Sequence, residues 1–325
     1  MNSFIKIAVI GGGSSYTPEL VEGIIQRNAV LRIKEIALVD IPSGAAKLSI
    51  IEGLVRRMLA KSGLDIKVTA TLNRQEALKD CSYVITQFRH GGLAGRALDE
   101  KIPLKYKLIG QETTGAGGFA LALRTIPVML SIARDMEQLC PKAWLINFTN
   151  PSGMITEAVS KHTGIKCIGL CNVPINMARD MSEQFGAAPQ DVYCEFVGLN
   201  HLSWIKRVFV RGQDVSDEIF DKELSGKHIV ANIRDVPGSE SLVKSIRLIP
   251  SPYLSYYYYE SYMLDEELDA VRSGKGTRAE QVRSVENELF EIYQDPMLDS
   301  KPEQLTQRGG SLYSEAAISL IESIH

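Results

Sequence analysis

The chain has 325 residues, of which 45% are hydrophobic and 23% charged, ordinary proportions for a globular protein long enough for about two domains. Its 36 basic and 39 acidic residues give a net charge of −3 without any block of like charges, which argues against nucleic-acid and membrane-surface partners. Five scattered cysteines, no signal-peptide pattern and no apolar run of bilayer length predict a cytoplasmic protein with reduced thiols.

The first half alternates short apolar runs with amphipathic segments, which is typical of a parallel sheet with crossover helices. We expect strands at 6–10, 35–39, 66–71, 83–88, 143–148 and 166–170. Helices are expected between them, most clearly over 45–61, over 119–139 with an interruption near Pro127, and from Pro151 onward. This pattern predicts an α/β fold, a Rossmann-type doubly wound parallel sheet.

From about residue 175 the rhythm changes. Segments 191–197 and 202–210 are expected to form antiparallel strands followed by a turn at 211–214, and a helix is expected over 278–294. We therefore predict a dinucleotide-binding domain over 1–175 and a mixed α+β domain over 176–325.

The first strand runs into a glycine-rich turn. A glycine at position 11 suits the tight turn, one at position 13 lets the backbone approach a pyrophosphate, and the following helix points N–H groups at the anion. Tyr16 stands where the third glycine of the usual fingerprint would be. A carboxylate at the end of the second strand can accept ribose hydroxyls, which favours NAD over NADP. The alternative is a glycine-rich turn in another flavodoxin-like fold. The expected cofactor residues are Gly11, Gly12, Gly13, Ser14 and Asp40.

Cys171 and His201 are candidate metal ligands. The cysteine lies at the carboxyl end of a predicted strand, where ligands collect in open α/β sheets, and the histidine lies between two strand-like runs. A thiolate and an imidazole suit a borderline divalent metal. On spacing alone, an ordinary core cysteine and a histidine with satisfied hydrogen bonds are the more common explanation of such a pair.

Several polar segments could enter the same site. Arg96 follows the fourth strand, Gln111 and Glu112 lie between glycines, and Asn150 ends the fifth strand, although turn and cap roles explain the amides as well. The tyrosine-rich run at 253–259 usually indicates packing at an interface. A tyrosine there could also act as a general base if a metal or Arg278 lowered its pKa.

The chain resembles glycoside hydrolase family four through the ordered motifs GGGSSYTPEL, FRHGGLAGRALDEKIPLKY, GQETTGAGG, NPSGMITEA, GLCNVPI, GLNHLSW and PYLSYYY, from residue 6 to about 290. These are NAD- and divalent-metal-dependent glycosidases with a lactate/malate-dehydrogenase-like fold. The resemblance implies oxidation at C3 of the sugar, elimination across C1–C2, addition of water and re-reduction, in place of the usual two-carboxylate route.

The resemblance also implies roles for individual residues. Cys171 and His201 would hold Mn²⁺ or a similar metal, and Tyr253 would remove the C2 proton, with Tyr256 as second choice. Asn172 matches members that act on 6-phospho-β-glucosides, whereas α-specific members generally have aspartate there. The expected substrate residues are Arg96, Gln111, Glu112, Asn150, Asn172 and Arg278.

We therefore expect a 6-phospho-β-glucosidase, acting on a phosphorylated disaccharide or aryl glycoside, that forms a homodimer or homotetramer. Family members continue beyond the position of His325, so the second domain is expected to be incomplete. His90 and Ala116 stand where relatives often have valine and proline. The alternatives are a plain NAD-dependent 2-hydroxy-acid dehydrogenase on the same fold and a truncated, inactive NAD-binding protein.

Overall fold

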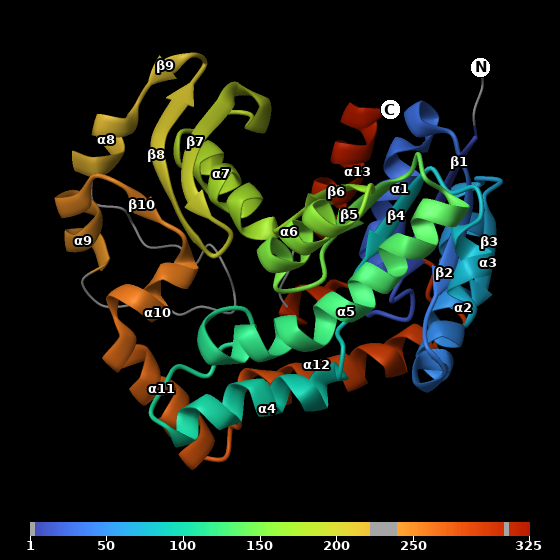
Figure 1. Cartoon of the computed structure of the whole chain (residues 1–325). Coiled ribbons are helices and arrows are strands. Elements are labelled where there is room, and N and C mark those ends of the chain that lie inside the picture. The colour runs from blue at the N-terminus through green and yellow to red at the C-terminus, as the bar shows by residue number, and fades with distance from the viewer. Residues whose placement is uncertain (1–3, 222–238, 309–311) are drawn as a thin grey trace.

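The computed structural model describes residues 4–221, 239–308 and 312–325. Its central sheet has six parallel strands in the order β3-β2-β1-β4-β5-β6, the arrangement of a doubly wound dinucleotide-binding fold (Figure 1). The strands are β1 (Ile5–Ile10), β2 (Ile33–Val39), β3 (Lys67–Thr71), β4 (Tyr83–Thr86), β5 (Trp144–Asn147) and β6 (Lys166–Gly169). All six predicted strands are confirmed, with ends that differ by one or two residues.

Helices cover both faces of this sheet because successive strand residues point to opposite sides. Ile7 and Val9 pack in one core with α1, α2, α12 (Arg278–Tyr293) and α13 (Tyr313–Ile324), whereas Ala8 and Ile10 pack in the other with α3, α5 and α6. The helices up to this point in the chain are α1 (Thr17–Leu31), α2 (Ala45–Ser62), α3 (Arg74–Leu78), α4 (Gly92–Lys105), α5 (Gly115–Leu139) and α6 (Ser152–His162).

The predicted interruption of α5 near Pro127 is wrong: the helix continues through this residue. Proline removes one backbone hydrogen bond, to the carbonyl of Leu123. Both residues lie on the exposed side of α5, where water can reach that carbonyl.

By length and composition alone, α5 is also long and apolar enough to cross a membrane. Met129, Ile132 and Met136 of this helix are nevertheless buried in the second core. The helix therefore serves as a core element of this fold.

The second sheet is antiparallel and lies beside the first, with α7 (Asn172–Gln184) between them (Figure 1). It pairs β10 with β8 and β8 with β7, and β9 also pairs with β8, so the predicted turn at 211–214 includes a short strand. These strands are β7 (Val192–Leu199), β8 (Leu202–Val210), β9 (Gln213–Asp214) and β10 (Ile249–Pro250). The nearby helices are α8 (Ser216–Asp221), α9 (Ser239–Ile246), α10 (Ser255–Tyr258) and α11 (Glu260–Arg272).

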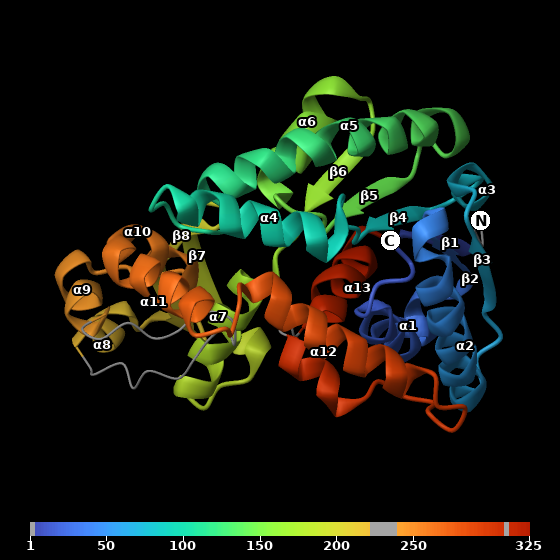
Figure 2. The ribbon, with the colours of Figure 1, turned by 90° about the horizontal axis from the view of Figure 1, so that it is seen from below.

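The last described helices return to the first sheet. Helices α12 (Arg278–Tyr293) and α13 (Tyr313–Ile324) bury Leu289, Tyr293 and Ile318 in the same core as α1 and α2; α12 packs against α2, and Figure 2 shows α13 beside α1. The boundary near residue 175 thus marks the passage between the two sheets. Assignment of all of 176–325 to one domain stays a prediction.

Candidate functional site

Two adjoining cavities open at the carboxyl edge of the parallel sheet. The glycine-turn cavity is bordered by Gly11, Gly13 and Asp40, and the Cys–His cavity by Cys171 and His201. The residues that line both, and so mark their junction, are Ser14, Gln87, Phe88, Arg89 and Arg308.

The glycine-turn cavity contains most of the predicted cofactor residues. Gly11 has a φ of +85°, and a β-carbon there would lie 2.9 Å from the backbone nitrogen of Phe88, so only glycine keeps this turn tight. Asp40 accepts hydrogen bonds from the N–H groups of Gly13 (3.0 Å) and Ile41 (2.8 Å). The bare backbone and the fixed carboxylate at the cavity wall fit a dinucleotide.

Gly12 was predicted with these residues but lines neither cavity. Its N–H donates to the carbonyl of Val39 at 2.7 Å, and a β-carbon on it would lie 2.8 Å from the Val39 nitrogen. This glycine is therefore required for packing of the turn against β2. His90 lines the glycine-turn cavity, whereas Ala116 is exposed on α5 and lines neither.

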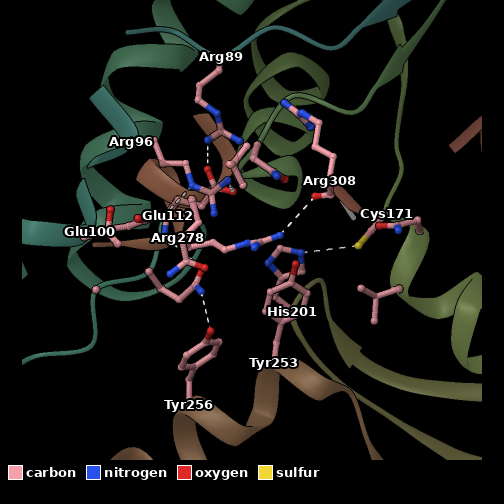
Figure 3. A pocket seen from close by; sticks show the side chains of 18 of the residues that line it. Arg89, Arg96, Glu100, Glu112, Cys171, His201, Tyr253, Tyr256, Arg278 and Arg308 are labelled. Carbon is pink, nitrogen blue, oxygen red and sulfur yellow. Dashed lines mark hydrogen bonds and ion pairs between the residues drawn. The ribbon is translucent and has the colours of Figure 1, made fainter. Parts of the chain in front are cut away.

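The Cys–His cavity brings the two candidate metal ligands together from different elements. Cys171 is the N-cap residue of α7, and His201 lies in the two-residue turn between β7 and β8 with a φ of +61°. The Cys171 Sγ and His201 Nε2 atoms are 3.6 Å apart (Figure 3). A left-handed histidine is uncommon, and such strained residues concentrate at functional sites.

This pair fits a divalent metal ion. Burial lowers the pKa of His201 to about 4, which keeps the imidazole neutral and able to coordinate. The 3.6 Å between Cys171 Sγ and His201 Nε2 is short enough for one ion to contact both atoms. Within the described ranges no group of three His, Cys, Asp or Glu side chains could hold a metal. Water or substrate would therefore complete the coordination.

The tyrosine-rich segment contributes two side chains to this cavity. The ring of Tyr253 stacks on His201 with centroids 3.7 Å apart and an interplanar angle of 19°. Tyr256 accepts a hydrogen bond from Gln111 Nε2 at 2.9 Å. Burial raises the pKa of both phenols, that of Tyr256 to about 12, so neither is ionised without positive charge nearby.

Arg96 is held by two buried carboxylates. Its Nε lies 2.6 Å from Glu100 Oε1, and its Nη1 lies 3.3 Å from Glu112 Oε1. Glu112 also contacts Arg89, and Glu100 accepts the backbone N–H of Ala279 at 2.8 Å. The charge of Arg96 is thus largely compensated within the protein (Figure 3).

All nine predicted substrate, catalytic and metal residues line the Cys–His cavity. Four further residues of this cavity were not predicted as functional: two lie in a quoted motif without a role implied for them, and two have no local pattern and reach the cavity only through folding. Arg89 and Glu100 lie in a motif already quoted, whereas Glu267 and Arg308 come from later helices. The four are Arg89, Glu100, Glu267 and Arg308.

Two family models together match most of the chain. The model for family 4 glycosyl hydrolases matches residues 6–187, and the model for the C-terminal domain of that family matches residues 196–325. A probable 6-phospho-β-glucosidase of Bacillus subtilis is 48% identical over 329 residues, which cover all of this chain and 74% of that protein. The 6-phospho-β-glucosidase of Escherichia coli is 47% identical over 330 residues, covering 100% and 73%.

Solved structures of a similar enzyme support the same family assignment. The 6-phospho-β-glucosidase from Thermotoga maritima, determined with NAD and glucose 6-phosphate, superposes with a TM-score of 0.87 at 44% identity, covering 98% of this chain and 73% of that one. The same enzyme has been determined with manganese, NAD⁺ and glucose 6-phosphate. Because both domain models match in order and the fold superposes, this chain belongs to the family 4 glycosyl hydrolases.

Proposed function

We propose that this protein hydrolyses 6-phospho-β-glucosides and requires NAD and a divalent metal ion such as Mn²⁺. The observation that carries the proposal is the cluster of Cys171, His201 and Tyr253, which lies in a cavity that adjoins the glycine-turn cavity. Relatives 45–48% identical over nearly the whole chain are named 6-phospho-β-glucosidases, which supports the same substrate class.

The side chains of the cavity have different roles in the proposed reaction. A bound NAD⁺ would supply a reversible hydride acceptor for oxidation at C3 of the sugar, and a metal ion held by Cys171 and His201 would supply electrophilic stabilisation of negative charge on the substrate. Tyr253 takes the proton from C2. Burial raises its pKa and Arg96 opposes this rise, so positive charge in the cavity favours the phenolate. A metal ion held by Cys171 and His201 would supply such charge beside the ring and would offset the effect of Cys171, which also raises the pKa of Tyr253.

Arg278 is the proposed partner of the sugar phosphate. Its guanidinium lines the Cys–His cavity and suits bidentate contact with phosphate oxygens. Burial and the neighbouring Arg96 lower its pKa, which means that both disfavour the charged guanidinium. A bound phosphate would stabilise that charge. Gln111, Glu112 and Asn150 supply further polar contacts to the sugar.

Asn172 supports the β specificity. An amide cannot donate a proton as a general acid at neutral pH, so this site suits a leaving group that needs little acid assistance. The substrate would be a phosphorylated disaccharide or an aryl glycoside.

We also propose a cytoplasmic homodimer or homotetramer. The five cysteines are all free, as in a reducing compartment. Large apolar side chains remain exposed on α4 and α5, as do Tyr257, Tyr258 and Tyr262 on α10 and α11, and such surfaces suit subunit contacts.

The test is hydrolysis of p-nitrophenyl 6-phospho-β-D-glucoside with NAD⁺ and Mn²⁺ present together and each omitted in turn. Release of nitrophenol that needs both is the expected result, without net formation of NADH because the hydride returns to the sugar. The 6-phospho-α-glucoside is the matched control and should react far more slowly. Net NADH would instead indicate a dehydrogenase, and turnover without NAD⁺ would contradict the redox route.

A further inference from the structure

A charged cluster formed by Lys47, Glu286 and Arg308 borders the glycine-rich turn. Glu286 of α12 accepts Lys47 Nζ at 2.6 Å through one carboxylate oxygen, and Arg308 Nη2 at 3.2 Å through the other. The hydroxyl of Ser15 lies 3.3 Å from Glu286 Oε1, the oxygen that also accepts the hydrogen bond from Arg308. The three groups come from α2, from α12 and from the short helix η4 (Glu303–Arg308), so the cluster joins distant parts of the chain.

The cluster carries a net positive charge beside the cavity. Burial opposes ionisation of Glu286, but Arg308 and Lys47 outweigh it and lower its pKa. Two cations therefore face one carboxylate, which leaves an excess of one positive charge. The Nε of Arg308 is buried and has no hydrogen-bond partner among the described residues. Buried donors without partners usually await a ligand or a water.

Arg308 lies at the junction of the two cavities. It lines both of them together with Ser14, and its guanidinium carbon lies 4.1 Å from the ring centroid of Tyr16. Tyr16 replaces the third glycine of the usual fingerprint and provides a flat surface on which the guanidinium rests. Glu286 and Tyr16 thus fix the side chain from two sides.

We propose that Arg308 binds the pyrophosphate of the dinucleotide and that Glu286 and Tyr16 hold it in position. A dinucleotide that reaches from the glycine-turn cavity to the Cys–His cavity must pass this junction. Its negative charge is confined to the two phosphates, whereas the oxidised nicotinamide is cationic and would repel a guanidinium. The wall opposite the glycine-rich turn is therefore supplied by the C-terminal part of the chain.

Calorimetric titration of the purified chain without sugar tests this role, which rests on the proposed use of NAD. The ligands are NAD⁺, ADP-ribose, which keeps the pyrophosphate without nicotinamide, and adenosine, which has no phosphate. Arg308→Met is expected to weaken NAD⁺ and ADP-ribose about 10- to 100-fold, the loss typical of a hydrogen bond between charged groups, and to leave adenosine unchanged. Arg308→Lys keeps the positive charge but cannot make the two parallel N–H contacts of a guanidinium, so a several-fold loss of affinity for NAD⁺ and ADP-ribose is expected.

Lys301→Met is the matched control, because Lys301 pairs with Glu22 at 2.6 Å and lines neither cavity. It should bind all three ligands as the wild type does. Unchanged ADP-ribose affinity in Arg308→Met would overturn the role, as would an equal loss of adenosine. If the methionine variant does not fold, Arg308→Lys decides between the same outcomes. Failure of the wild type to bind NAD⁺ would refute the proposed cofactor itself.

Discussion

At the scale of the residue, the position of His201 depends on its neighbours in the turn between β7 and β8. Gly198 has a φ of +109°, and a β-carbon there would lie 2.2 Å from the carbonyl oxygen of Leu202. Any other residue at this position must therefore displace the start of β8 and, with it, the adjoining turn residue His201 relative to Cys171. The 3.6 Å between the two ligands depends on a glycine that touches neither.

Gly198→Ala is expected to weaken Mn²⁺ binding at least 10-fold while leaving NAD⁺ affinity unchanged, because the hairpin tip moves and the glycine-turn cavity does not. Electron paramagnetic resonance of free Mn²⁺ measures the first and calorimetry the second. Gly212→Ala is the control: its φ is +81° and nothing lies within 4 Å of the added carbon. That variant should lose about 1 kcal/mol of stability and keep its metal affinity. Equal metal affinity in the two variants would contradict the prediction.

At the scale of the element, α11 is tied to the loop that carries Gln111 and Glu112. Glu267 accepts the N–H of Gly110 at 2.7 Å. Burial, with a contribution from Glu100, raises the pKa of Glu267 to about 7. A carboxyl whose pKa is raised on folding adds stability below its unfolded pKa, and this contribution disappears as pH rises through the folded value.

Urea unfolding between pH 5 and 8 should reveal this group. The wild type is expected to lose about 2 kcal/mol more stability over that range than Glu267→Gln, because its buried carboxyl must ionise in the folded state. Glu260→Gln, at the exposed start of α11, serves as control and should follow the wild type. A Glu267→Gln profile parallel to that of the wild type would exclude this explanation.

The individual strands and helices also show which features the sequence predicts and which depend on tertiary packing. Apolar runs predict β1 to β6 within two residues, because burial on both faces leaves a signal in consecutive positions. The continuation of α5 through Pro127 depends on which side of the helix faces water, which no local pattern records. The Glu286–Arg308 contact joins two elements whose partners are fixed only by packing. Arg96 was predicted to share a site with Cys171 and His201 and lines the same cavity as they do, but its ion pairs with Glu100 and Glu112 were not predicted.

At the scale of the whole molecule, the exposed apolar side chains of α4 and α5 bear on assembly. Leu98 is 58% exposed, and Phe119 and Leu123 are each 60% exposed. These helices lie side by side along one edge of the molecule (Figure 2). Burying such side chains contributes roughly 25 cal/mol per Å² of apolar surface, which favours association.

Light scattering at micromolar concentration should give a dimer or tetramer. Leu123→Glu is expected to shift the population toward monomer, because a charge would be buried at the contact. Glu157→Gln on α6, whose side chain is 60% exposed, is the matched surface change and should leave the assembly intact. A monomeric wild type would refute the proposed oligomer.

Helix α1 can be covered by α13 only after nearly the whole chain has been synthesised. The backbone N–H of Tyr313 donates to Glu19 Oε1 across 294 positions of sequence. A ribosome that adds about 5–20 residues per second needs roughly 15–60 s to supply that partner. Until then, the side of α1 that α13 covers in the folded chain remains exposed in the nascent chain, and transiently exposed apolar surface of this kind favours aggregation. Yield in the cell should therefore depend on chaperone supply during translation as well as on the stability of the finished fold.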